Sequence, residues 1–172
     1  MGNWQRRKHR LLAKLFTRFR WLTTLWLRGH TFTKLGPPPW TPLPKPLSTC
    51  TVALVTTAGV HRRDDQPFDM TDPDGDPSYR EIPGDWPLEE LTITHDYYDH
   101  SDADKDLNIV FPLQRLQEFQ AEGRIGRLAP VHYSFMGHID KHHLPVLLYE
   151  TAPEVATKLK EQKVDVVLLT PA

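Results

Sequence analysis

The chain has 172 residues, of which 39% are hydrophobic and 25% are charged, and its formal net charge is −1. This length suits one domain of ordinary size with a real hydrophobic core. The single cysteine, Cys50, excludes an intrachain disulfide, a zinc ribbon and a Cys-x-x-Cys redox pair within these residues, and it fits a reducing, cytoplasmic compartment. No run of 18 apolar residues occurs, so the sequence predicts no membrane-spanning helix.

Charge divides the chain into two parts. All 22 acidic residues follow residue 63, whereas 12 of the 21 lysines and arginines lie within residues 1–63. We interpret residues 1–35 as a basic arm, 36–47 as a proline-rich extended linker, and 48–172 as an acidic α/β body. The plainest interpretation of the opposite charges is that the arm packs against its own body.

The arm is predicted to form one amphipathic helix over residues 6–28. On a helical wheel its basic residues fall opposite an apolar face made of Leu11, Leu12, Leu15, Phe16, Phe19, Leu22 and Trp26. Docking into a groove of its own protein or of a partner is favoured over contact with an anionic membrane surface, because any surface helix shows this pattern. A mitochondrial transit peptide is a further interpretation of an acid-free, arginine-rich start. No nucleic-acid-binding motif is present, so no nucleic-acid partner is predicted.

The body begins with strands and a long loop. Residues 51–57 form a β-branched apolar run that predicts a buried first strand, and the glycine at 59 turns the chain at its carboxyl end. An acidic loop at 64–76 follows, which is long enough to suggest a functional role. Residues 91–95 alternate as a short strand.

The second half of the body continues the alternation. A helix is predicted over 112–122, a strand at 131–135, another strand at 145–149, a helix over 153–162 and a last buried strand at 164–169. We predict an α/β fold with an open, mostly parallel sheet and flanking helices. Only three residues follow the last strand, so we expect the sheet to be incomplete at the C-terminus and the chain to be a truncated protein.

The densest polar cluster runs from His95 to Asp104. Histidine, aspartate and tyrosine act as acids, bases or metal ligands. A metal-free polar active-site loop is one interpretation, and a metal site formed by His95, Asp99, His100 and Asp104 is a second. A solvated turn with helix-capping aspartates is the third.

A second group of histidines lies further along the chain. His132 falls within a predicted strand, where it is expected to be buried and hydrogen-bonded, and His142 and His143 are expected at the surface. Cys50 has no neighbouring cysteine or histidine, so we interpret it as structural.

Several ordered segments together resemble a known family. They are PWTPL at 39–43, VALVTTAG at 52–59, GDPSYREIP at 75–83, HDYYDHSDAD at 95–104, FPLQRL at 111–116, GRIG at 123–126, HYSFMG at 132–137 and DVVLLTP at 165–171. Over residues 39–172 the chain resembles the glycine/sarcosine/betaine/D-proline reductase family, on the side of selenoprotein B and the selenium-containing subunit of D-proline reductase.

That resemblance implies a fold and a chemistry. It implies an α/β sheet protein whose selenocysteine or cysteine nucleophile follows soon after the segment matching residues 164–171, so the nucleophile is absent from these residues and is expected just after Ala172. It further implies attack of the selenolate on the substrate's α-carbon, a pyruvoyl-type partner subunit that holds the amine, and a dithiol or thioredoxin-like reductant. We therefore expect selenocysteine in the complete chain, no cofactor bound by these residues, and no redox turnover by them alone.

The predicted site residues follow from both lines of reasoning. Three histidines are predicted to be catalytic: His95, His100 and His132. Seven residues are predicted to bind substrate or shape its pocket: Gly59, His61, Asp99, Asp102, Asp104, Thr170 and Pro171. The leading hypothesis is a selenium- or thiol-dependent reductase that cleaves a C–N bond, without a metal. The alternatives are a metal-dependent hydrolase on the 95–104 cluster and a non-catalytic interaction protein.

Overall fold

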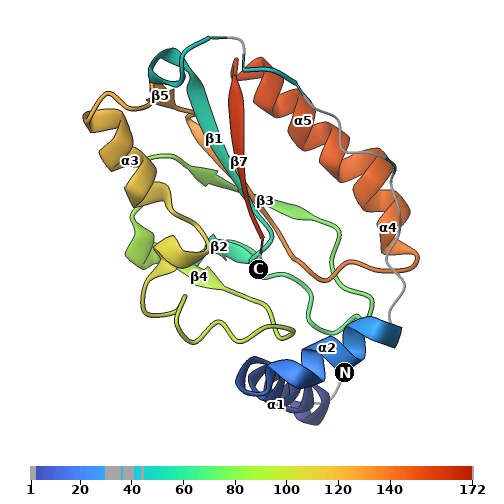
Figure 1. Cartoon of the computed structure of the whole chain (residues 1–172). Helices are drawn as coiled ribbons and strands as arrows, with labels where there is room; N and C mark the ends of the chain where they lie inside the picture. The colour runs from blue at the N-terminus through green and yellow to red at the C-terminus, as the bar shows by residue number, and fades with distance from the viewer. Residues whose placement is uncertain (1–2, 30–35, 37–40, 44, 172) are drawn as a thin grey trace.

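A computed structural model describes residues 3–29, 36, 41–43 and 45–171, so residues 37–40 and 44 of the predicted linker lie outside the described residues. The body is an α/β layer structure, and the two helices of the basic arm lie at one end of it (Figure 1). The predicted fold class is confirmed.

The main sheet is built around strand β1 (Thr51–Thr56). The other strands of this sheet are β3 (Tyr79–Pro83), β5 (Arg127–Leu128), β6 (Val131–Phe135) and β7 (Val166–Thr170). Strand β1 pairs in parallel with β5, β6 and β7, and β3 pairs antiparallel with β6, so the sheet is mostly parallel. The expected first strand is thus the centre of the sheet.

The core forms on both faces of β1. Val52, Ala53 and Leu54 are almost inaccessible to solvent, as expected for a β-branched and apolar central strand. Leu54 packs in the cluster that contains Leu113, and the next residue, Val55, packs in the opposite cluster. Alternate side chains of one strand therefore bind the sheet to helices on its two sides.

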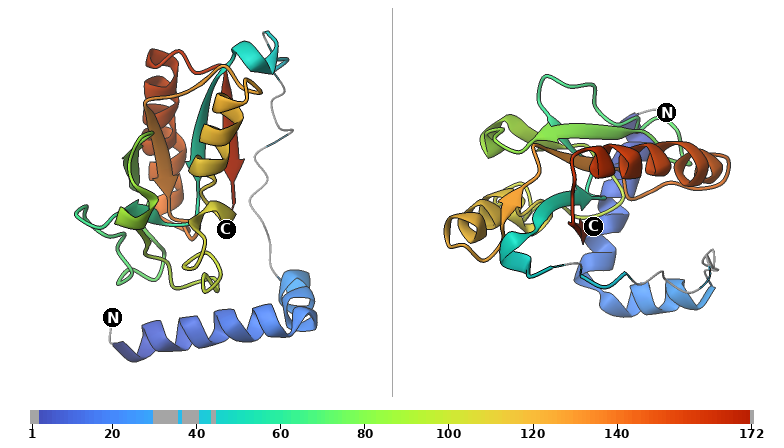
Figure 2. Two further views of the ribbon diagram at one scale, coloured as in Figure 1. Left: turned by 90° about the vertical axis from the view of Figure 1, so that its left-hand side faces the viewer. Right: turned by 90° about the horizontal axis from the view of Figure 1, so that it is seen from above.

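Helices cover both faces of the sheet (Figure 2). Helix α3 (Leu113–Ala121) packs on one face, and α5 (Ala152–Glu161) packs on the other. Short α4 (His143–Val146) and a π-helical turn (Leu147–Thr151) lead directly into α5.

The strand predicted at residues 145–149 is wrong, because this stretch is helical. Pro145 lies in the first turn of α4, where its missing N–H removes no helical hydrogen bond. The wide π turn comes just before Pro153, which cannot donate to the turn behind it. The apolar run therefore continues as one helical segment instead of pairing in the sheet.

The last strand forms as β7, but the prediction that it is buried is wrong. Val167, Leu168 and Leu169 are 36%, 39% and 68% exposed. Strand β7 pairs with β1 along one side, and no described strand pairs with its other side. The strand therefore forms an apolar edge of the sheet.

The predicted place of the nucleophile follows this strand. Ala172, after which the selenocysteine or cysteine is expected, lies outside the described residues. The structure therefore does not test that position, and the nucleophile just after Ala172 stays a prediction.

A second, two-stranded sheet lies beyond the end of β1. It pairs β2 (Val60–Arg62) antiparallel with β4 (Leu91–Ile93). The strand predicted at 91–95 therefore exists, but it lies outside the parallel sheet.

The arm forms two helices instead of the single predicted helix. They are α1 (Asn3–Arg18) and α2 (Arg20–Gly29), which meet at Phe19. The face of α1 that contacts the body includes His9, whose ring centroid lies 4.9 Å from that of Tyr97, whereas Leu11 on the predicted apolar face is 70% exposed. In the described part of the chain, no helix combines the length and apolar character needed to cross a bilayer.

Charge holds the arm on the body. The Nε groups of Arg6 and Arg10 donate hydrogen bonds to the two carboxylate oxygens of Asp96, at 2.5 and 2.6 Å. Asp96 is only 2% exposed. Burial raises the pKa of this carboxyl group, but the bonds from Arg6 and Arg10 outweigh burial and leave the pKa below its usual value. The arm thus packs against its own acidic body.

Candidate functional site

Three parallel strands end together at the carboxyl edge of the sheet. The hydroxyls of Thr56 in β1 and Thr170 in β7 both donate to the carbonyl of Val110, at 2.9 and 2.8 Å. The N–H of Thr57 donates to the carbonyl of Thr170 at 3.1 Å. Thr170 and the following Pro171 thus lie at the edge where open α/β sheets collect their ligands.

Gly59 joins the small sheet to this edge. Its N–H donates to Phe135 at the end of β6, and its carbonyl accepts from Thr94 after β4, both at 2.9 Å. Gly59 has a φ of +70°, and a Cβ there would lie 2.5 Å from the carbonyl oxygen of Thr94. Only glycine permits this approach, which places His95 beside the ends of β1 and β6.

His95 is buried at this edge as a neutral ring. Its Nδ1 lies 3.1 Å from the N–H nitrogen of Tyr97, and its Nε2 lies 3.2 Å from that of Gly137. A neutral imidazole accepts at only one nitrogen, and a protonated one at neither. Burial, helped by His138 and His100, lowers the pKa of His95 to about 4. At neutral pH the ring is therefore uncharged and keeps one N–H, and its other nitrogen accepts from one of these two backbone N–H groups.

His100 lies close to His95 but is differently placed. Its Nδ1 is 2.9 Å from Oδ2 of Asp104, and its side chain is 21% exposed. The ring of Tyr98 lies against both histidines, with centroids 4.8 Å from His95 and 5.6 Å from His100. The structure therefore brings two of the three predicted catalytic histidines to one place and gives the second a carboxylate partner.

The other two predicted aspartates shape the turn. Asp99 accepts from the N–H of Ser101 at 3.2 Å, and hydrogen bonding from Ser101 lowers the pKa of this carboxyl group. Asp102 is exposed and forms an ion pair with Lys105 at 2.8 Å. These contacts match the solvated-turn part of the third interpretation, but no helix begins at Asp99 or Asp102, and the next helical turn is capped by Asp106. The predicted role of Asp99 and Asp102 in substrate binding stays a prediction.

His132 lies within the sheet, away from this edge. Its Nδ1 accepts from the N–H of Leu54 at 3.0 Å, so the ring stands where a strand carbonyl would otherwise pair with β1. It is fully buried, and burial lowers its pKa to about 4. The predicted burial is observed, and this position favours a structural role; catalysis by His132 stays a prediction.

His61 and Cys50 are also buried in structural contacts. The two ring nitrogens of His61 lie 2.7 Å from the carbonyl oxygen of Arg62 and 2.8 Å from the hydroxyl of Thr94. Burial lowers the pKa of His61. Cys50 is fully buried with its sulfur 3.5 Å from two backbone carbonyl oxygens, as a structural cysteine would be.

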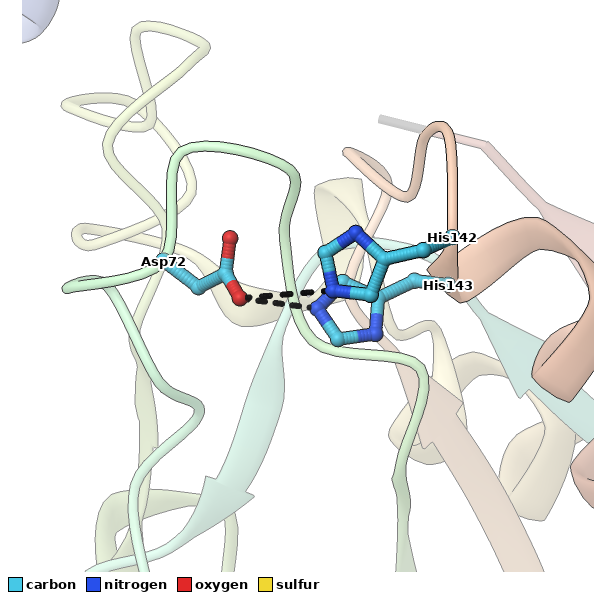
Figure 3. A group of neighbouring side chains, drawn as sticks. All are labelled: Asp72, His142 and His143. Atoms are coloured by element: carbon cyan, nitrogen blue, oxygen red, sulfur yellow. Dashed lines mark hydrogen bonds and ion pairs between the residues drawn. The ribbon is translucent and has the colours of Figure 1, made fainter.

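The metal ligands proposed in the 95–104 cluster do not converge on one point. Among the described residues, ligand atoms of Asp72, His142 and His143 form the single group of three or more that could hold one ion (Figure 3). The sequence placed two of these residues at the surface and did not connect them with Asp72, because the pairing spans 71 positions.

The acidic loop borders a cavity of about 850 Å³. Its lining combines carboxylates of the loop, including Asp65, Asp69 and Asp76, with Arg80 of β3 and His143. The sequence predicted a functional loop here but not the residues that complete the cavity wall.

Comparisons with known proteins identify relatives of this chain. The family described as glycine/sarcosine/betaine reductase selenoprotein B matches residues 30–172. The chain is 42% identical over 145 residues to the D-proline reductase subunit gamma of Acetoanaerobium sticklandii, covering 84% of this chain and 58% of that protein. It is 29% identical over 137 residues to the betaine reductase complex component B subunit beta of Peptoclostridium acidaminophilum, covering 73% and 29% of the two chains. No solved structure matches.

Proposed function

Because the chain belongs to the glycine/sarcosine/betaine reductase selenoprotein B family, we propose that it is part of a selenium- or thiol-dependent reductase subunit that cleaves a C–N bond. The identity of 42% to a D-proline reductase subunit over 84% of the chain carries this proposal. Both relatives are named as subunits or complex components, which supports partner subunits here as well. The chain spans less than two thirds of the length of each of these relatives.

In this proposal the nucleophile is not Cys50. That thiol is fully buried between backbone carbonyls, so it cannot reach a substrate without opening the fold. We assign the nucleophile to a selenocysteine or cysteine outside these 172 residues. The carboxyl edge around Thr170 and His95 is where the proposed nucleophile acts.

The proposed reaction has two steps. A selenolate or thiolate forms a bond to the carbon that carries the amine, the C–N bond breaks, and its electron pair goes to nitrogen, which takes up a proton. A thiol of an external dithiol then attacks the selenium or sulfur, and the carbon leaves with the bonding pair and takes a proton. The second thiol closes a disulfide and returns the nucleophile as a selenolate or thiolate.

The buried histidine and the carboxylate-paired histidine suit different roles in this scheme. His100, held by Asp104, would supply the proton to the departing nitrogen. His95 is buried and neutral at working pH, and it would act as a positioning residue that holds the backbone around Tyr97 and Gly137 at this edge.

The test uses the native reductase complex purified from the source cells. We expect the complex to consume D-proline, glycine, sarcosine or betaine only when dithiothreitol is present. Proton NMR measures this consumption. A protein carrying the equivalent of this chain with intact partner subunits, yet inactive on all four amines, would contradict the proposal.

A further inference from the structure

Two segments far apart in the sequence bring three metal-binding side chains together (Figure 3). Asp72 comes from the acidic loop between β2 and β3, and His142 and His143 stand at the start of α4. Oδ2 of Asp72 lies 3.0 Å from Nε2 of His143 and 3.8 Å from Nε2 of His142. One ligand atom from each of the three residues lies within 4.8 Å of the others.

These separations suit a small divalent ion. Zinc binds imidazole nitrogen and carboxylate oxygen at about 2.0–2.2 Å, so neighbouring ligands of a tetrahedral ion stand about 3.3–3.5 Å apart. The two distances from Asp72 fall on either side of that spacing. Small side-chain movements would therefore suffice to close the ligands around an ion.

A second carboxylate stands behind one ligand. Oδ2 of Asp74 is 3.4 Å from Nδ1 of His142, on the side of the ring away from the nitrogen that faces Asp72. The N–H of Asp74 also donates to Oδ1 of Asp72 at 2.9 Å, which leaves Oδ2 to face the histidines. Metal-binding histidines commonly have a carboxylate on their second nitrogen, because it fixes the ring and raises its basicity.

Backbone contacts hold the two segments together. Gly75 forms an antiparallel bridge with Ile139, and the N–H of Asp140 donates to the carbonyl of Asp74 at 2.8 Å. Gly75 has a φ of +96°, and a Cβ there would lie 1.8 Å from the carbonyl oxygen of His138. A side chain at this position would force the segments apart, so glycine permits an arrangement that needs little ordering on binding.

We propose that Asp72, His142 and His143 bind one divalent transition-metal ion, with zinc as the ion of choice. Imidazole with one carboxylate suits zinc and its neighbours, whereas calcium and magnesium prefer all-oxygen sites. Three protein ligands leave a fourth position for water or a small ligand. Asp72 and His143 also line the 850 Å³ cavity, so this position would lie at the cavity wall.

The test titrates the full chain with zinc sulfate after chelator treatment and desalting. Calorimetry should show one zinc ion per chain at micromolar zinc, and zinc should raise the melting temperature by mass action. We expect Asp72→Asn and His143→Ala to remove both effects, and Asp74→Asn to weaken binding by about 10–100-fold.

The matched control is His100→Ala, which removes a different His–Asp pair with the same 2.9–3.0 Å separation. It should bind zinc as the unaltered chain does. Circular dichroism establishes that each variant is folded. Absence of zinc binding by the folded unaltered chain would overturn the proposal and leave a simple His143–Asp72 contact. Binding that survives Asp72→Asn and His143→Ala, or is lost in His100→Ala, would also overturn it.

Discussion

Two buried histidine rings, His95 and His132, hold backbone N–H groups of the fold in place. His132 accepts the backbone N–H of Leu54 and takes the place of a strand carbonyl, while His95 faces two backbone N–H groups at the carboxyl edge. Both rings must stay neutral to serve as acceptors. The free energy of unfolding therefore depends on the protonation state of each ring.

Stability should consequently fall in acid. The pKa of His132 is about 4 in the folded chain against about 6.5 when unfolded, so the unfolded chain binds the extra proton between these values. Stability then rises with pH across this window, and the full shift corresponds to about 3 kcal/mol. The free energy of unfolding can be measured with urea at several pH values between 6.5 and 4.5. It should change less with pH in His132→Asn, whose amide oxygen is placed to accept from Leu54 as the imidazole does. An unchanged dependence on pH would show that His132 does not titrate in this way.

His100 should matter for turnover more than for stability. In the complete reductase, His100→Asn should lower the rate of dithiol-dependent amine cleavage by about 10²-fold or more, because the proposed proton donor is lost. Steady-state assays with melting curves separate the two effects. Glu118→Gln on α3 removes an exposed ion pair with Arg115 and should change neither. Full activity in His100→Asn would remove this histidine from the mechanism.

At the scale of elements, the sequence predicted the helices and strands whose own residues carry a clear hydrophobic or capping pattern. The β-branched run of β1, the proline-led helix α3 and the strand β6 all appear where expected. Strand β3 was missed because Ile82 is its only fully buried residue and its remaining side chains are polar, aromatic or proline.

The candidate sites depend even more than the strands on contacts between segments that are far apart in the sequence. Thr170 could be placed at a sheet edge, because parallel strands carry their ends to one side. His95 follows β4 of the antiparallel pair, and the contacts of Gly59 bring it to that edge. The sequence did not show that His142 and His143 meet Asp72, since that contact depends on how the acidic loop crosses the start of α4. Nor did it show that the arginines of the arm meet Asp96, which required the path of α1 over the body.

The arm should detach when its arginines are removed. Replacing Arg6 and Arg10 with alanine leaves the carboxylate of Asp96 without the two donors that keep it charged in a buried place. Loss of one side of a buried ion pair costs about 3–5 kcal/mol, and less here because the arginines are partly exposed. We expect faster hydrogen exchange in α1 and a lower melting temperature.

The control for this prediction changes charge without touching Asp96. Arg7→Ala with Lys8→Ala removes the same two charges from exposed positions of α1 and should leave exchange in α1 nearly unchanged. Asp96→Asn should restore part of the stability lost by the arginine variant, because the uncompensated charge is gone. Equal effects of both charge-removing variants would contradict a specific role for the ion pairs.

At the scale of the whole molecule, the exposed apolar edge of β7 is the feature that most favours self-association. An exposed apolar edge strand invites pairing with another chain. We expect the 172-residue chain to self-associate as its concentration rises, measured by light scattering. Leu169→Lys on β7 should reduce this association. Leu11→Lys on α1 alters a leucine of similar exposure, 70% against 68%, and should have little effect if the sheet edge is responsible.

The proposed chemistry depends on a nucleophile that the buried Cys50 cannot provide. The most direct measurement is the intact mass and selenium content of the native protein purified from its source. Our account predicts a polypeptide that continues past Ala172, with one selenium per chain or a second cysteine that is alkylated in the folded state. A native polypeptide of 172 residues that contains no selenium and has Cys50 as its single thiol would contradict it.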